Sequence, residues 1–162
     1  MQQDINEFSN QFHFTSSDIL EILLKEKGWQ NQYRRIMLLG KELPELPVSL
    51  KLDDKLVAGC ESNVWLNYQW VNGQLKLAAS SDSKVVKGLI TIILAAYNNK
   101  EQCQILDFKI ESYLDELGLL QQLSPSRGNG VQAIVAKIMA IAQSCHWQYN
   151  CLNYAYNGFS KS

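Results

Sequence analysis

The chain has 162 residues and a mass of 18.4 kDa, and hydrophobic residues make up 46% of it against 19% charged residues. This length and composition are typical of one globular domain and exclude a disordered or fibrous chain. The formal net charge is -1, so the sequence carries no evident footprint for nucleic acid or an anionic membrane. We expect a single domain over 1–162, with a core over about residues 16–144 and terminal extensions at 1–15 and 145–162.

The sequence also predicts a cellular location. The N-terminal residues lack the basic start and apolar run of a secretion signal, and the most apolar stretch, residues 89–97, is shorter than the ~20 residues that span a bilayer. The cysteines, which form no Cys-x-x-Cys pair or zinc-ligand pattern, are Cys60, Cys103, Cys145 and Cys151. We therefore expect a cytoplasmic protein with no membrane contact, no metal and cysteines that are thiols.

Two helices are predicted in the first part of the chain. A helix over 18–27, capped by residues 16–18 and ended by Gly28, precedes a second helix over 30–39, where apolar residues recur at helical spacing. Two prolines make the following segment, 43–50, irregular.

The middle of the chain has the pattern of a β-hairpin. Residues 64–71 and 74–79 alternate between apolar and polar, and Asn72-Gly73 between them is a strong turn signal because both positions favour positive φ. Placing the residues that flank the turn opposite each other pairs apolar residues on one face: Trp70 with Leu75, Tyr68 with Leu77, and Leu66 with Ala79. A third strand is predicted just before the hairpin, over 55–58.

Helices return after the hairpin. Residues 83–97 are apolar nearly all round, which predicts a central buried helix. Short helices are expected over 101–106 and 111–117, and a final helix from Asn129 carries an apolar stripe. This order predicts an α+β fold with a three- to four-stranded antiparallel meander sheet and helices packed on one of its faces.

Cys60 is the first candidate for a chemical role. It follows Gly59 and lies between two strand-like runs, so we expect it at the tip of a tight connection, where a thiol can be presented to a partner. The local sequence offers no activating base, and the negative charge of Glu61 would raise the pKa of the neighbouring thiol. A cysteine without its own base suggests an acceptor that a partner enzyme activates. Packing in the interior is the alternative role.

A second candidate region is the turn-rich loop over 124–130. Its Arg127 could clamp a carboxylate on a neighbouring loop or chain, or simply be solvated. Asp82 has two interpretations, a partner contact or a helix cap, and capping is favoured. Trp65 and Trp70 point to opposite faces of the sheet, so Trp65 needs a cover of its own.

Several motifs occur together in one order over about residues 16–144. They are Gly28-Trp29-Gln30 with Tyr33; Leu39-Gly40-Lys41-Glu42-Leu43-Pro44; Val57-Ala58-Gly59-Cys60-Glu61-Ser62-Asn63-Val64-Trp65-Leu66; Ser81-Asp82 with Val85-Val86-Lys87-Gly88-Leu89; and Leu117-Gly118-Leu119 through Leu123-Ser124-Pro125-Ser126-Arg127. Together they resemble the SufE/CsdE family of sulfur-acceptor proteins, somewhat closer to its CsdE members. The fold implied by the resemblance is similar to that of the iron–sulfur scaffold proteins.

The resemblance also implies a function. In the family, the cysteine at the position of Cys60 accepts sulfur as a persulfide from a PLP-dependent cysteine desulfurase, stimulates that enzyme and relays the sulfur, typically towards iron–sulfur cluster assembly. Asp82 and Arg127 match motif positions near the acceptor loop or its partner, and Glu61 and Ser62 flank the acceptor. PLP belongs to the partner, so we expect no cofactor on this chain, which would be a non-autonomous acceptor subunit. A homodimer and the identity of the downstream sulfur recipient stay open.

Three other functions compete with this interpretation. An iron–sulfur scaffold needs several converging cluster ligands, whereas Cys60 stands alone in its loop. An independent thiol peroxidase needs a low-pKa cysteine with a local activator. A purely regulatory desulfurase-binding protein would use Cys60 only for packing. Because a persulfide is easily lost in water, the acceptor function predicts that Cys60 is partly sheltered in the free protein and that its loop swings out on docking.

Overall fold

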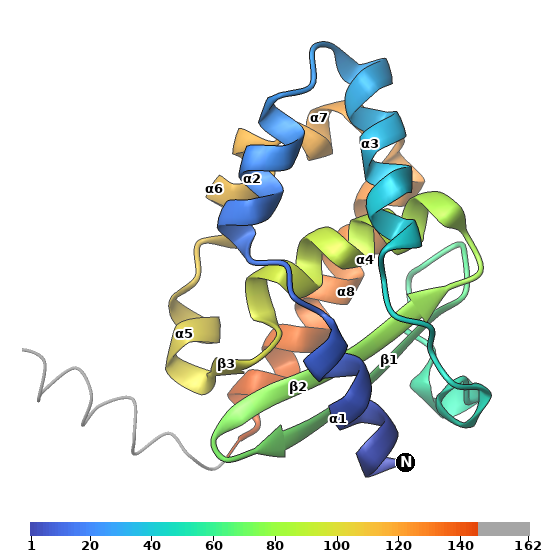
Figure 1. The fold of residues 1–162 in the computed structure, drawn as a ribbon, viewed down its shortest axis with the longest axis vertical. Helices are drawn as coiled ribbons and strands as arrows, with labels where there is room; N and C mark the ends of the chain where they lie inside the picture. Colours follow the sequence, from blue (N-terminus) through green and yellow to red (C-terminus); the bar gives the residue numbers. More distant parts are fainter. Residues whose placement is uncertain (146–162) are drawn as a thin grey trace, which may run out of the picture.

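The computed structural model describes residues 1–145, and its centre is a three-stranded antiparallel sheet flanked by helices (Figure 1). Before the sheet come α1 (Gln2–Gln11), α2 (Ser16–Leu24), α3 (Trp29–Lys41) and the 3-10 turns η1 (Val48–Leu50) and η2 (Asp53–Lys55). The strands are β1 (Val64–Val71), β2 (Gln74–Ser81) and β3 (Lys100–Glu101). The later helices are α4 (Lys84–Tyr97), α5 (Gln102–Asp107), α6 (Ile110–Glu116), α7 (Leu119–Gln122) and α8 (Pro125–Gln143). None of the helices in residues 1–145 has the length and apolar character needed to cross a membrane.

The predicted hairpin is confirmed residue by residue. Asn72 and Gly73 both have positive φ, at 51° and 80°, as the two-residue turn requires. The register places Trp70 opposite Leu75, Tyr68 opposite Leu77 and Leu66 opposite Ala79. The predicted α+β class with an antiparallel sheet is therefore confirmed, with strands in the order β1-β2-β3.

The third strand, however, is not the one predicted over 55–58. That segment begins at the last residue of η2 and meets β1 only at a bridge between Leu56 and Trp65, beside a hydrogen bond from the Val57 N–H to the Val64 carbonyl. Pairing stops there because Gly59, with φ of 89°, turns the chain away. The true third strand is β3, which pairs with β2 after the chain has passed through α4.

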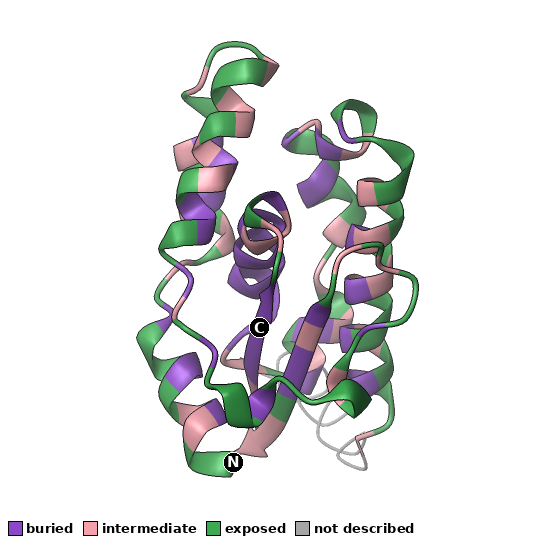
Figure 2. Cartoon of the chain, turned by 90° about the vertical axis from the view of Figure 1, so that its right-hand side faces the viewer, coloured by how far each residue is buried: buried purple, intermediate pink, exposed green. Residues whose placement is uncertain are grey.

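Helices cover both faces of β2, not one face as predicted. Residues 77–81 of β2 are all buried, which requires packing on either side of the strand. Figures 1 and 2 place α1 on one side of the sheet and α4 with α8 on the other. Residues 1–15, expected as a terminal extension, contribute Ile5, Phe8 and Phe12 to the hydrophobic core.

The last helix begins earlier than predicted. Helix α8 starts at Pro125, and the side chain of Ser124, not of Asn129, caps it by accepting a hydrogen bond from the Arg127 N–H. Proline suits a first helical position because its missing N–H would have no partner there. As a result the turn-forming residues 128–130 lie inside the helix, and Gly130 faces the loop that carries Cys60.

Candidate functional site

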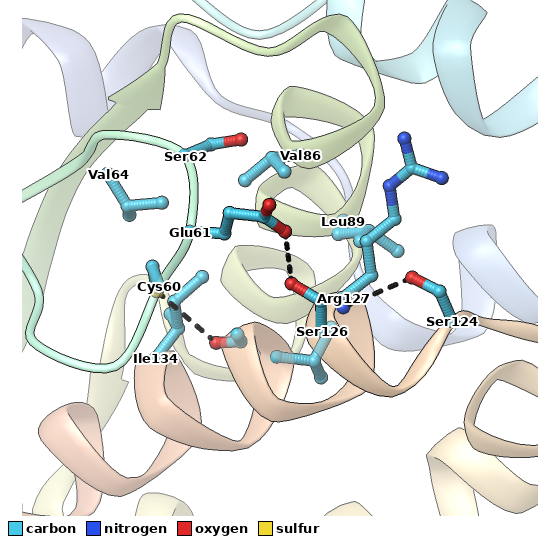
Figure 3. Close-up of a pocket in the computed structure, with 12 residues that line it drawn as sticks. Cys60, Glu61, Ser62, Val64, Val86, Leu89, Ser124, Ser126, Arg127 and Ile134 are labelled. Carbon is cyan, nitrogen blue, oxygen red and sulfur yellow. Dashed lines mark hydrogen bonds between the residues drawn. The ribbon is translucent and has the colours of Figure 1, made fainter.

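Cys60 lies in a loop that joins Val57 to β1 and rests against α8 (Figure 3). Gly59 makes the sharp turn before it, and a Cβ at this glycine would lie 3.5 Å from Ala133 of α8. The Cys60 Sγ donates a hydrogen bond to the Gly130 carbonyl, at 3.7 Å. The loop thereby places its thiol against the N-terminal part of α8.

A cavity of about 430 Å³ surrounds this thiol. It lies between the Cys60 loop, the first turns of α4 and the N-terminal half of α8 (Figure 3). Its lining residues are Cys60, Glu61, Ser62, Val64, Val86, Leu89, Ser124, Ser126, Arg127, Gly130, Val131 and Ile134. The structure thus brings together four of the five predicted site residues: Cys60, Glu61, Ser62 and Arg127.

Two residues at the start of α8, Ser126 and Arg127, line the cavity and make different contacts. The Ser126 hydroxyl donates a hydrogen bond to the Glu61 carboxylate, which ties the loop to the first turn of α8 (Figure 3). Arg127, one residue further, does not clamp Glu61. Its guanidinium points away from Cys60 and lies over the Tyr33 ring of α3, 5.9 Å from the centroid.

The environment of the Cys60 thiol lowers its reactivity. Cys60 is half-buried, which confirms the predicted partial shelter, and burial raises the pKa of its thiol by penalising the thiolate. The predicted direction of the shift is therefore right, but its cause is desolvation, not the charge of Glu61. Within residues 1–145 the cavity lining includes neither histidine nor lysine, and its one carboxylate, Glu61, is held by the Ser126 hydroxyl.

Asp82 stands apart from this group. It is exposed in the turn between β2 and α4 and does not line the cavity. The predicted capping role belongs to Ser83, whose side chain accepts a hydrogen bond from the Val86 N–H. The partner-contact interpretation of Asp82 stays a prediction.

Cys103 and Cys145 do not line the cavity. Cys145 is a free thiol just after α8, whereas Cys103 is disulfide-bonded. The expectation that every cysteine is a thiol is therefore wrong for Cys103. Cys151, with the rest of the extension beyond Cys145, lies outside the described residues.

Sequence reasoning missed three participants in the site. Ser126 holds Glu61, Gly130 accepts the thiol hydrogen bond, and Tyr33 receives the Arg127 guanidinium. The turn-rich composition of residues 124–130 did mark this segment. Recognising its contacts required the position of α8 relative to the Cys60 loop, which local sequence does not encode.

Comparison with known proteins identifies the family of this chain. A family model described as SufE, Fe-S metabolism associated domain, matches residues 17–142. The chain belongs to the SufE family. A relative is the sulfur acceptor protein CsdE of Escherichia coli, 39% identical over 113 residues that cover 69% of this chain and 77% of the relative. This identity supports the predicted closeness to CsdE within the SufE family.

A solved structure supports the fold of this SufE-family chain. It is the solution structure of a hypothetical protein from Thermus thermophilus, with a TM-score of 0.63 over 85% of this chain and 96% of that one. The two sequences are only 14% identical. The likeness therefore concerns the arrangement of the sheet and helices.

Proposed function

We propose that this chain accepts the terminal sulfur of a cysteine desulfurase persulfide onto Cys60. Among residues 1–145 Cys60 is the one thiol that lines the cavity, it follows Gly59 in a loop, and the matched relative is named a sulfur acceptor protein. The observation that carries the proposal is this half-buried thiol, beside which residues 1–145 place no histidine or lysine. Such a thiol is unsuited to independent catalysis but suited to receive sulfur from an enzyme that brings its own activating groups.

The transfer is an exchange between sulfur atoms. The Cys60 thiolate attacks the outer sulfur of the desulfurase Cys–S–SH group, a new S–S bond forms at Cys60, and the S–S bond in the desulfurase breaks. The desulfurase cysteine leaves as a thiolate with the bonding electron pair and takes a proton from solvent. The sulfur moves without an external oxidant or reductant.

The same step explains stimulation of the partner. Removing the persulfide regenerates the desulfurase cysteine for another turnover, so an efficient acceptor speeds the enzyme. A thiolate on the next protein can then attack the outer sulfur of the Cys60 persulfide in the same manner. We propose that this relay takes place in the cytoplasm and supplies iron–sulfur cluster assembly, a role in keeping with the Fe-S metabolism named in the description of the matched family.

The geometry of the loop fits a carrier that shelters its cargo. The apolar side chains of Val86, Leu89 and Ile134 line the cavity beside the thiol, so a persulfide held inward would be partly shielded from water and oxidants. To meet another protein, Cys60 must turn outward. Gly59 directly precedes Cys60, and because glycine lacks a Cβ its backbone can change conformation for that motion.

The decisive experiment uses intact-mass spectrometry. The wild-type chain and Cys60→Ser are each incubated with PLP-loaded cysteine desulfurase and cysteine, and then measured before and after reduction. Wild type should gain about 32 Da per added sulfur, reversibly on reduction, because a persulfide is a reducible modification. Cys60→Ser should gain none at this site.

The matched control is Cys145→Ser, which removes the other free thiol of the described residues from a position outside the cavity. It should load sulfur like wild type. Desulfurase turnover measured in parallel should rise with wild type and with Cys145→Ser. If Cys60→Ser stimulated turnover fully, a purely regulatory role would replace the acceptor role.

A further inference from the structure

A groove lined by lysines lies on the far side of the first turns of α4 from the Cys60 cavity. Its volume is about 350 Å³, and it is bounded by the end of α3, residues 43–46, Ser80 of β2 and the start of α4. Lys41, Lys51, Lys84 and Lys87 line it, against a single carboxylate from Glu45. The groove is therefore strongly cationic.

The lysine groove continues towards the acceptor site along α3. A second hollow of about 400 Å³ includes Arg34, Met37 and Arg127. It shares Met37 with the lysine groove and Arg127 with the Cys60 cavity. We call the six cations of this continuous surface the basic track: Arg34, Lys41, Lys51, Lys84, Lys87 and Arg127.

None of the six cations of the basic track forms an ion pair with a carboxylate of residues 1–145. The ion pairs in that part of the chain are Met1 with Asp4 and Lys25 with Glu21, and neither involves the track. Lys51 and Arg127 instead lie over the rings of Trp65 and Tyr33. The track holds six of the fifteen Lys and Arg residues of a chain whose net charge is -1, so positive charge is concentrated on this surface, which reaches the acceptor site at Arg127.

We propose that the basic track docks an acidic surface of the cysteine desulfurase that loads Cys60. This inference rests on the proposed function and adds the chemistry by which the partner is recognised. Unpaired cations attract a complementary acidic surface over roughly a Debye length of about 8 Å at physiological salt, and so raise the association rate. The track reaches the cavity at Arg127, so a protein bound along it lies beside the sulfur-accepting thiol. A nucleic acid would also be attracted by cations, but it has no thiol or persulfide to offer Cys60.

The test reverses the two lysines at the start of α4. The variant Lys84→Glu/Lys87→Glu should fold, since acidic side chains are favourable at a helix N-terminus. Lys109→Glu/Lys137→Glu is the matched control, because both lysines are exposed, line none of these three hollows and give the same change in net charge. Circular dichroism checks the fold of each.

The readout is the dissociation constant with PLP-loaded desulfurase at low and high salt. The α4 variant should bind about tenfold or more weakly at low salt, chiefly through slower association, with a shallower salt dependence. The control pair should stay within about twofold of wild type. The neutral variant Lys84→Gln/Lys87→Gln should fall between wild type and the reversal.

Sulfur loading separates this inference from the proposed function. At saturating concentration the α4 variant should still gain sulfur on Cys60, because its thiol is intact. If wild type binds the desulfurase but gains no sulfur, the proposed function fails. The docking inference is then tested by the dissociation constants of the variants alone. Equal weakening by both double reversals would overturn the docking inference. So would unchanged desulfurase affinity, including the case in which the α4 variant instead loses binding to a test RNA oligonucleotide.

Discussion

The Ser126 hydroxyl of α8 donates a hydrogen bond to the Glu61 carboxylate, and this contact fastens the loop that carries Cys60 to a helix more than sixty residues away in sequence (Figure 3). Together with the hydrogen bond from the Cys60 thiol to the Gly130 carbonyl, it holds the thiol inward. The loop can open only when these two contacts are given up. Their combined free energy therefore sets how often Cys60 turns outward, which the proposed function requires.

Ser126→Ala should make Cys60 more reactive. A hydrogen bond contributes about 0.5–1.5 kcal/mol net, so its loss should raise the open population, and with it the rate of labelling by a bulky thiol reagent, by about two- to tenfold. Mass spectrometry of the peptide containing Cys60 gives the rate at this site alone. Glu61→Gln keeps an acceptor for the hydroxyl and should stay closer to wild type. Equal labelling of Ser126→Ala and wild type would show that this contact does not restrain the loop.

The reactivity of Cys60 in the free protein should also have a displaced pH profile. Burial raises the pKa of the thiol, so at any neutral pH the thiolate fraction is smaller than in an unfolded chain. Alkylation should keep rising above about pH 8.5, where the rate of an unhindered thiol begins to level off. The same peptide measured in denaturant provides the reference curve. A folded-state curve that levels off at lower pH than this reference would mean that a neighbouring group activates the thiol.

The hairpin was predictable because its determinants are local. Asn72-Gly73 sets the turn, and the alternation on either side sets the register without reference to the rest of the chain. The third strand was not predictable in this way, because β3 has only two residues and pairs with β2 from beyond α4. Nothing in its own sequence distinguishes it from a helix cap.

The site shows the same division. Cys60, Glu61 and Ser62 are neighbours in sequence, and the turn-rich loop around Arg127 stood out by composition. The contact between the two segments depends on how α8 packs, so Ser126 and Gly130 were missed. Arg127 was singled out as a candidate carboxylate clamp; it lines the cavity with Cys60, but its guanidinium lies over the ring of Tyr33, which comes from α3.

The crossing of α3 and α4 gives a prediction for stability. A Cβ on Gly88 would lie 2.1 Å from the Ile36 carbonyl oxygen, which is backbone and cannot rotate away. Gly88→Ala should therefore push the helices apart and lower the free energy of unfolding by about 3 kcal/mol, as measured by urea denaturation.

Gly128→Ala is the control for this effect. Gly128 also lies in a helix, but a Cβ there meets nothing within 4 Å. This variant should be neutral or more stable by about 0.5–1 kcal/mol, since alanine is the better helix former. If the two variants had the same free energy of unfolding, α3 and α4 would not pack as closely at Gly88 as the structure shows.

Asn98 should anchor α1, the helix whose place in the core the sequence did not reveal. Its side-chain amide donates to the Ser9 carbonyl at 3.1 Å, and its Oδ1 accepts from the Ser9 hydroxyl at 2.8 Å and the Leu77 N–H at 3.0 Å. Asn98→Ala leaves these buried groups without their partner, so it should cost about 2–3 kcal/mol. Hydrogen exchange should show the loss of protection first in α1. Gln3→Ala, on the exposed side of α1, should change stability by less than about 0.5 kcal/mol, and unchanged protection of α1 in Asn98→Ala would rule out the anchoring role.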